Sequence, residues 1–94
     1  MDKDKVYQEI TEQLKEEGAV KIAVFGSFVR DEEEKGSDID ILVTFSETKS
    51  LLELARIERE LSENIGIKVD LLTENSLSPY IRDNVHKEMK EVYG

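Results

Sequence analysis

Two aspartates stand at the head of an apolar segment, where carboxylates are costly to bury. Asp38 and Asp40 flank Ile39 and come directly before the apolar run 41–45. Short runs rich in Val, Ile and Phe predict buried strands. Residues two apart on a strand point to one face, with Cα atoms about 6.5–7 Å apart, so both carboxylates face one spot. Such a pair is suited to one or two hard divalent cations, such as Mg²⁺.

A glycine and a serine follow another apolar run, residues 20–25. Gly26 has no side chain and lets a backbone approach closely. Ser27 offers an amide and a hydroxyl at the start of a short helix expected at about 28–32, a favourable place for a phosphate. If phosphate donors and metal ligands face one ligand, the end of the first strand lies beside the start of the second. Together they predict a site for a metal-bound nucleoside triphosphate.

A third carboxylate, Asp70, lies within the apolar run 67–72. A helix expected at 51–64 separates this run from the second strand, which implies a right-handed crossover and parallel pairing. Asp70 then lies beside Asp38 and Asp40. The alternative is a strand-edge aspartate that accepts a hydrogen bond from a backbone amide.

Hydrophobic periodicity predicts the elements that position these residues. The expected order is α-β-α-β-α-β-α, a small mixed sheet of at least three strands flanked by helices, in a single α/β domain over residues 1–94. The first two strands are expected to be antiparallel, because their connection is too short for a crossover helix. The second strand is expected to be central, since Ile41–Val43 is apolar on both faces.

The predicted bounds and buried positions are as follows. The first helix covers 4–17 with Val6, Ile10 and Leu14 buried, and the strands cover 19–25, 38–45 and 67–72. The second helix, capped by Ser50 and Glu53, directs Leu51, Leu54, Ile57, Leu61 and Ile65 to the core. The last helix begins at Ser78-Pro79 and buries Ile81, Val85, Met89 and Val92. Tyr7 is expected at the edge of the core, and His86 is expected to be exposed.

The segments Gly26–Arg30 and Ser37–Asp40 resemble the signature of the DNA polymerase beta-like nucleotidyltransferase superfamily. The spacing and short chain look most like its minimal nucleotidyltransferases, the MNT or MntA-like proteins, which are commonly paired with a HEPN-domain toxin. One departure is Asp31, where that family often has a glycine, and it affects the connecting loop.

The resemblance implies a role for each motif residue. Asp38, Asp40 and Asp70 are expected to be catalytic and to bind the metal, and the expected nucleotide-binding residues are Gly26, Ser27, Arg30 and Ser37. The alternative role of Arg30 is an ion pair on the helix surface with Asp31 or a nearby glutamate.

Composition excludes several other chemistries. The 94 residues carry a net charge of −9, which disfavours general nucleic-acid binding but attracts a basic protein partner. With no cysteine and one histidine, a thiol nucleophile, a disulfide frame and a Cys- or His-rich metal site are excluded. There is no signal-peptide core and no apolar run approaching the ~18 residues of a spanning helix, so we expect a cytoplasmic protein without membrane contact.

The sequence supports one main function and leaves alternatives open. The main hypothesis is a Mg²⁺-dependent transferase that moves AMP from ATP to a hydroxyl. The resemblance points to a tyrosine of a partner HEPN toxin, as in an antitoxin of a type VII-like toxin–antitoxin pair. The alternative is a non-catalytic antitoxin that silences its toxin by stoichiometric contact. Transfer to RNA or to a small molecule such as an aminoglycoside is less favoured, because such relatives usually carry a further substrate domain. The sequence also leaves open a homo-oligomer.

Overall fold

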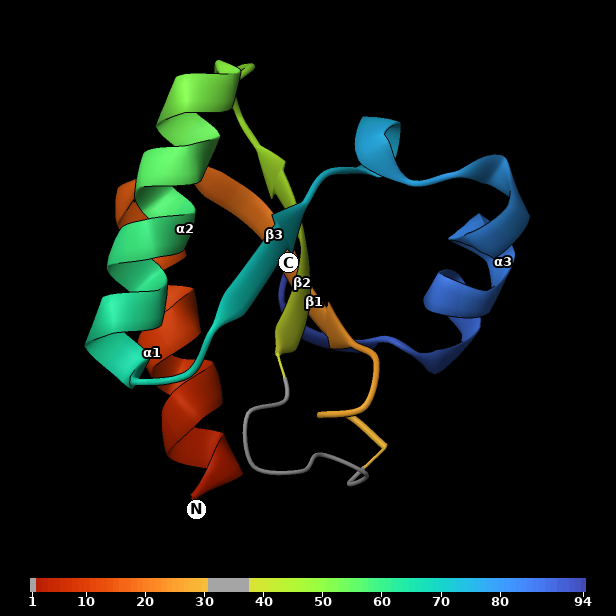
Figure 1. The fold of residues 1–94 in the computed structure, drawn as a ribbon, viewed down its shortest axis with the longest axis horizontal. Coiled ribbons are helices and arrows are strands. Elements are labelled where there is room, and N and C mark those ends of the chain that lie inside the picture. The colour runs from red at the N-terminus through yellow and green to blue at the C-terminus, as the bar shows by residue number, and fades with distance from the viewer. Residues whose placement is uncertain (1, 31–37) are drawn as a thin grey trace.

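The computed structural model describes residues 2–30 and 38–94. Its centre is a four-stranded mixed sheet with helices on both faces. Helices α1 and α2 cover one face and α3 covers the other (Figure 1). The strand order is β3-β2-β1-β4. In chain order the elements are α1 (Lys3–Glu16), β1 (Ala19–Phe25), β2 (Ile39–Phe45), α2 (Leu51–Ile65), β3 (Val69–Leu72), the 3₁₀ turn η1 (Glu74–Ser76), α3 (Pro79–Glu88) and β4 (Lys90–Tyr93).

The strand pairings match the expected topology. β1 and β2 are antiparallel, β2 and β3 are parallel, and β2 lies inside the sheet. The third strand is shorter than the predicted 67–72, because Val69 already pairs with Ile39, the first residue of β2. The predicted caps are also present: Ser50 and Glu53 form a capping box at α2, and the Ser78 side chain accepts from Tyr80 N at α3.

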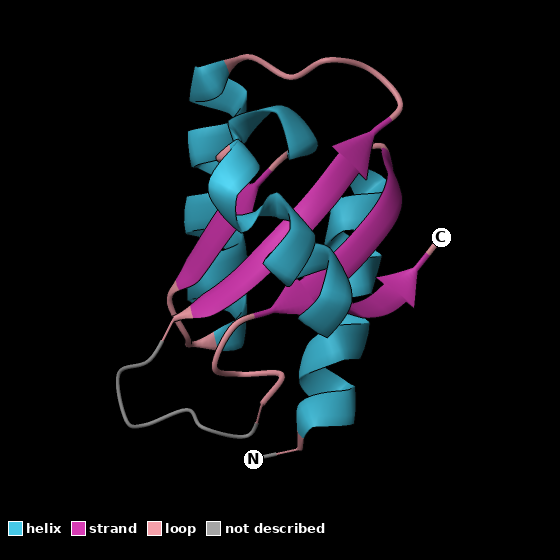
Figure 2. Ribbon diagram, turned by 90° about the vertical axis from the view of Figure 1, so that its right-hand side faces the viewer, coloured by secondary structure: helices cyan, strands magenta, loops and turns pink. Residues whose placement is uncertain are grey.

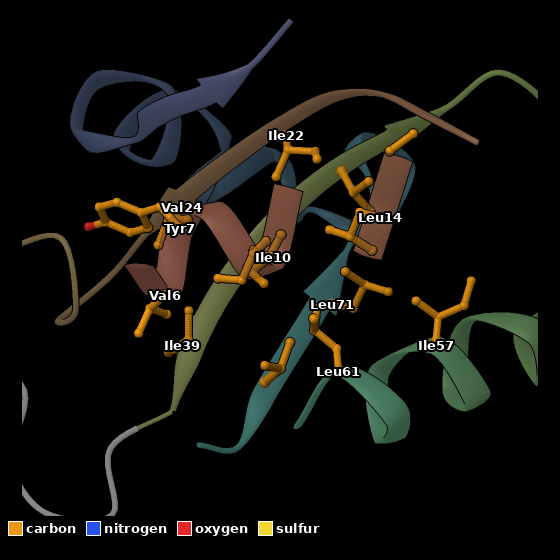
Figure 3. Close-up of a cluster of buried hydrophobic side chains, with 14 of the residues drawn as sticks. Val6, Tyr7, Ile10, Leu14, Ile22, Val24, Ile39, Ile57, Leu61 and Leu71 are labelled. Carbon is orange, nitrogen blue, oxygen red and sulfur yellow. The ribbon is translucent and has the colours of Figure 1, made fainter. Parts of the chain in front are cut away.

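The core divides along the two faces of the sheet. The larger cluster lies between the sheet and α1 with α2, and the side chains of Ile10, Leu14, Ile22, Ile39 and Leu61 meet there (Figure 3). A smaller cluster lies on the α3 face and consists of Ala23, Phe25, Leu42, Leu77 and Val85. Because strand side chains alternate, burial of Ile39 and Ile41 in the larger cluster turns Asp40 to the α3 face with Leu42.

The prediction of the last helix is wrong at Ile81 and after Glu88. The helix ends at Glu88, and residues 90–93 form β4, which pairs antiparallel with β1. Ile81, expected in the core, is 46% exposed, while Val92 packs against the larger cluster from β4. A four-residue apolar spacing continues past the end of the helix, but the backbone groups of the β1 edge need hydrogen-bond partners, and a Val-Tyr pair suits a strand.

Two smaller corrections concern turns of helix. Ser27–Arg30 forms a hydrogen-bonded turn rather than a short helix, with the amides of Val29 and Arg30 donating to Gly26 O at 3.2 and 3.3 Å. The remainder of the predicted 28–32 helix lies outside the described residues. Leu51 is 85% exposed instead of buried. It lies about 120° around the helix axis from Ile57, off the buried stripe.

None of the described helices has the length and apolar composition needed to cross a membrane.

Candidate functional site

The three predicted aspartates meet at one end of the sheet, where β2 and β3 begin. Asp40 and Asp70 are direct partners in the parallel β2–β3 pairing, and Asp38 lies just before β2. Val69 and Leu71 turn into the larger core, so Asp70 shares the α3 face with Asp40. β3 is an edge strand, so Asp70 is a strand-edge aspartate as in the alternative interpretation, and its side chain hydrogen-bonds that of Asp40. Its role in binding a metal stays a prediction.

The electrostatics of this carboxylate set are unfavourable in the absence of a cation. Burial raises the pKa of Asp40 to about 6, and the charge of Asp70, a hydrogen bond between the two side chains and the charge of Asp38 act in the same direction. Arg30 acts in the opposite direction. A divalent cation would relieve this repulsion, and the oxygen-only donor set fits Mg²⁺.

Asp38 is engaged elsewhere in this conformation. Its Oδ2 lies 3.7 Å from the ammonium nitrogen of Lys68, whose side chain is 73% exposed. Within residues 2–30 and 38–94, no three metal-ligating side chains form a ready metal cage. The aspartates therefore lie at the same end of the sheet, as predicted, and Asp38 Oδ2 is also within ion-pair distance of Lys68.

Gly26 lies against the aspartates on the neighbouring strand. β1 ends where β2 begins, with Phe25 paired to Asp40, so Gly26 is next to the Asp40 carboxylate. A Cβ atom on Gly26 would overlap Asp40 Oδ2, and the backbone φ is +81°, a conformation that favours glycine. Ser27 follows at the start of the turn. The end of β1 lies beside the start of β2 at one end of the sheet, so the predicted phosphate donors and metal ligands are adjacent. Figure 2 shows the sheet from the side of α3.

Arg30 has a partner that the sequence did not indicate. Its Nη1 donates to Glu88 Oε2 at 2.7 Å, and the Gly26 amide donates to Glu88 Oε1 at 3.1 Å. The ion pair found here joins Arg30 to a glutamate 58 residues away in the sequence, and the expected partner Asp31 lies outside the described residues. Nothing in the local pattern singles out Glu88 among the acidic residues; only the chain path from α3 into β4 brings it to the site.

The other candidates fall outside the site or outside the described residues. Ser37 and Asp31 belong to the segment that is not described, so the role of Ser37 stays a prediction. Tyr7 is buried at the core edge, with its ring 5.8 Å from that of Phe28. His86 is exposed on α3, where its Nε2 is 2.9 Å from Glu74 Oε1.

Carboxylates beside a glycine–serine turn form an arrangement suited to nucleotide chemistry. The carboxylates can hold a cation against a triphosphate, and the backbone amides of the turn can bind its phosphate oxygens. The side chains of Asp38 and Arg30 are 32% and 44% exposed, so a ligand can reach this end of the sheet from solvent.

Comparison with known proteins gives a consistent result. The family model described as nucleotidyltransferase domain matches residues 7–92, which include every candidate site residue. A Methanocaldococcus jannaschii protein, named provisionally as a protein adenylyltransferase, is 41% identical over 98% of this chain and 99% of its own length. The protein adenylyltransferase MntA of Thermococcus cleftensis is 43% identical over 77% of this chain and 73% of its own length.

Among solved structures, one similar fold is the MNT antitoxin in complex with a tri-AMPylated HEPN toxin from Shewanella oneidensis. The TM-score is 0.79 at 22% identity, with 97% of this chain and 71% of that chain covered. At this identity the likeness concerns the fold alone.

Proposed function

This chain belongs to the nucleotidyltransferase domain family, as its sequence motif predicted, and on that premise we propose that it transfers AMP from ATP to a hydroxyl group of a partner protein. The observation that carries the proposal is the direct pairing of Asp40 with Asp70 beside Gly26. A fold without catalytic function gains nothing from a partly buried pair of carboxylates, since each loses part of its hydration.

Each residue has a defined part in this proposal. Asp38, Asp40 and Asp70 would hold Mg²⁺, which supplies charge neutralisation of the triphosphate and activation of the acceptor hydroxyl. The Gly26 and Ser27 amides bind the phosphates beyond the α-phosphorus, where negative charge builds up on the leaving group. Arg30 contributes its guanidinium to the same oxygens once it is released from Glu88.

The transfer is an in-line displacement at the α-phosphorus. The acceptor oxygen forms a bond to phosphorus and gives up its proton to a carboxylate of the site, while the bond from the α-phosphorus to the bridging oxygen of the β-phosphate breaks and pyrophosphate leaves with the bonding electrons. The transfer needs no acceptor pocket within the chain, because the exposed end of the sheet admits a hydroxyl carried by another protein.

We propose a tyrosine of a HEPN-type toxin as the acceptor. Two observations support it: the relatives at 41% and 43% identity carry the name protein adenylyltransferase, and a protein of the same fold is in complex with an AMPylated HEPN toxin. The net charge of −9 favours approach of a basic partner surface.

The test is intact-mass spectrometry of the cognate HEPN toxin after incubation with this protein and Mg²⁺-ATP. We expect the toxin to gain the mass of one or more AMP units, on a tyrosine located by peptide sequencing. The double variant D38A/D40A should remain folded and fail to transfer. The matched control is D83A, which removes an exposed carboxylate from α3 outside the site and should transfer normally.

A different outcome would select the alternative function. If the wild-type protein blocks the toxin without changing its mass, and D38A/D40A blocks it equally well, the protein is a stoichiometric antitoxin.

A further inference from the structure

One carboxylate holds two of the groups that the proposed function assigns to the triphosphate. Glu88 accepts from the Gly26 amide at 3.1 Å through Oε1 and from Arg30 Nη1 at 2.7 Å through Oε2. A backbone amide and a guanidinium presented side by side are donors that suit phosphate oxygens as well as carboxylate oxygens. Glu88 therefore uses the same donors as an anionic ligand would.

The chain path places Glu88 at this point. It is the last residue of α3, and Met89 closes the helix through its amide, which donates to Val85 O at 2.9 Å. Lys90 then pairs with Val24, two residues before Gly26, so the backbone of Glu88 is held close to the end of β1.

The side chain of Glu88 can leave without unfolding its surroundings. It is 32% exposed and its carboxylate contacts groups at the solvent edge of the sheet. Rotation about its side-chain bonds moves the carboxylate into water, where it regains hydration. Because the backbone is held by the α3 C-terminus and β4, this movement needs no rearrangement of the sheet.

We propose that Glu88 occupies the triphosphate-binding donors in the nucleotide-free protein and is displaced when the nucleotide binds, so that it lowers the affinity for nucleotide. This inference rests on the proposed function. Each phosphate oxygen that reaches Gly26 or Arg30 replaces a Glu88 oxygen, and the two anions repel one another if both stay. The affinity for nucleotide then depends on how much more strongly these donors bind the phosphate oxygens than the Glu88 carboxylate.

Calorimetric titration with Mg²⁺ and a non-hydrolysable ATP analogue tests this. E88Q keeps the size of the side chain and removes its charge, and we expect about tenfold tighter binding than wild type, since an ion pair and a charge-assisted hydrogen bond no longer compete. E88A, which removes the competitor altogether, should also bind more tightly. Melting curves of both variants establish that they are folded.

The matched control is E91Q. Glu91 carries the same charge three residues along the chain, but it pairs with Lys21 at 3.2 Å on the β1–β4 edge. E91Q should bind the analogue as wild type does, which separates displacement of Glu88 from a general loss of negative charge. Equal tightening in E88Q and E91Q would overturn the inference.

The remaining outcomes are also decisive. Weaker binding by E88Q would show that Glu88 positions Arg30 for the nucleotide, and unchanged binding would show that it does not compete; both overturn the inference and leave the proposed function standing. If the wild-type protein, E88Q and E88A all fail to bind the analogue, the proposed function falls, and this inference falls with it.

Discussion

At Gly26 the absence of a side chain is the feature that the site depends on. The space a Cβ would take is filled by Asp40 Oδ2, and the backbone is in the left-handed region with φ +81°. Both constraints act at the point where the proposed phosphate donors and metal ligands meet. Replacement by any other residue therefore affects the backbone and the carboxylate together.

We predict that G26A lowers the free energy of unfolding by at least about 1 kcal/mol more than G66A does. Gly66 also has a positive φ of +74°, but nothing lies within 4 Å of the position that a Cβ atom would take there, so G66A bears only the backbone cost of about 1–2 kcal/mol. G26A adds the displacement of Asp40. Urea denaturation of both variants measures the difference, and equal losses would show that the Asp40 contact is relieved without cost.

Asp40 makes the nucleotide-free protein sensitive to pH. Its pKa in the folded state is about 6, above the ordinary value of 3.8, so the folded state binds a proton more readily than the unfolded state does. The resulting contribution to stability is complete below pH about 4 and is lost as the pH rises through about 6.

We predict that D40N removes this loss. Each pKa unit corresponds to about 1.4 kcal/mol. After allowance for the partial exposure of Asp40, wild type should lose about 1–2 kcal/mol between pH 4 and pH 7. D40N should be more stable than wild type at pH 7 and equal to it near pH 4, as measured by urea denaturation in the presence of a chelator. The exposed variant D83N should keep the wild-type pH dependence, and a D40N profile parallel to wild type would contradict the prediction.

At the level of elements, α2 does more than cover one face of the sheet. β3 is an edge strand, and two of its amides donate to side chains of α2: Val69 N to Ser62 Oγ at 2.9 Å and Leu71 N to Glu58 Oε2 at 2.8 Å. These contacts satisfy backbone groups that an edge strand otherwise leaves open. They also fix the strand that carries Asp70.

We predict that S62A lowers the free energy of unfolding by about 1 kcal/mol, because the Val69 amide loses its partner. E58A should have a similar effect through Leu71. The control is E63A, at an exposed position of the same helix, which should change stability by less than about 0.5 kcal/mol. If S62A and E63A unfold at the same urea concentration, the helix does not stabilise the edge of β3 in this way.

For the whole molecule, the dominant property is an excess of negative charge, −9 over 94 residues. An anionic nucleotide binds such a chain only if cations offset both the ligand and the aspartates. On the proposed function we expect the stability of the fold to depend on Mg²⁺ and ATP together, since a ligand that binds only the folded state stabilises it by mass action.

We predict that Mg²⁺-ATP at about 100 times its dissociation constant stabilises the fold by about 2.7 kcal/mol. For a domain of this size that raises Tm by roughly 10 °C or more. ATP with a chelator should give a much smaller shift, and D38A/D40A should show none with either. A full shift in the chelated sample would rule out these aspartates as the reason for nucleotide affinity.

Local pattern was sufficient for much of this protein. The apolar runs and caps predicted α1, β1, β2 and α2 nearly to the residue, and the connection lengths predicted which strands are parallel, because side-chain period and crossover geometry are properties of the chain itself. For the same reason the pairing of Asp40 with Asp70 could be foreseen. The polarity of Asp38, Asp40 and Asp70 within apolar runs was the signal.

The C-terminal end could not be read in this way. Whether residues 90–93 continue a helix or form a strand depends on the open edge of β1, which lies far away in the sequence, and Lys90 finds its partner Val24 only after the sheet exists. The position of Glu88 at Gly26 and Arg30 follows from that strand. The engagement of Asp38 with Lys68 is likewise a matter of side-chain packing at the folded edge. Contacts between segments that are distant in the sequence depend on which of several possible partners lie close in the folded chain. Residue type and spacing along the chain do not determine that choice.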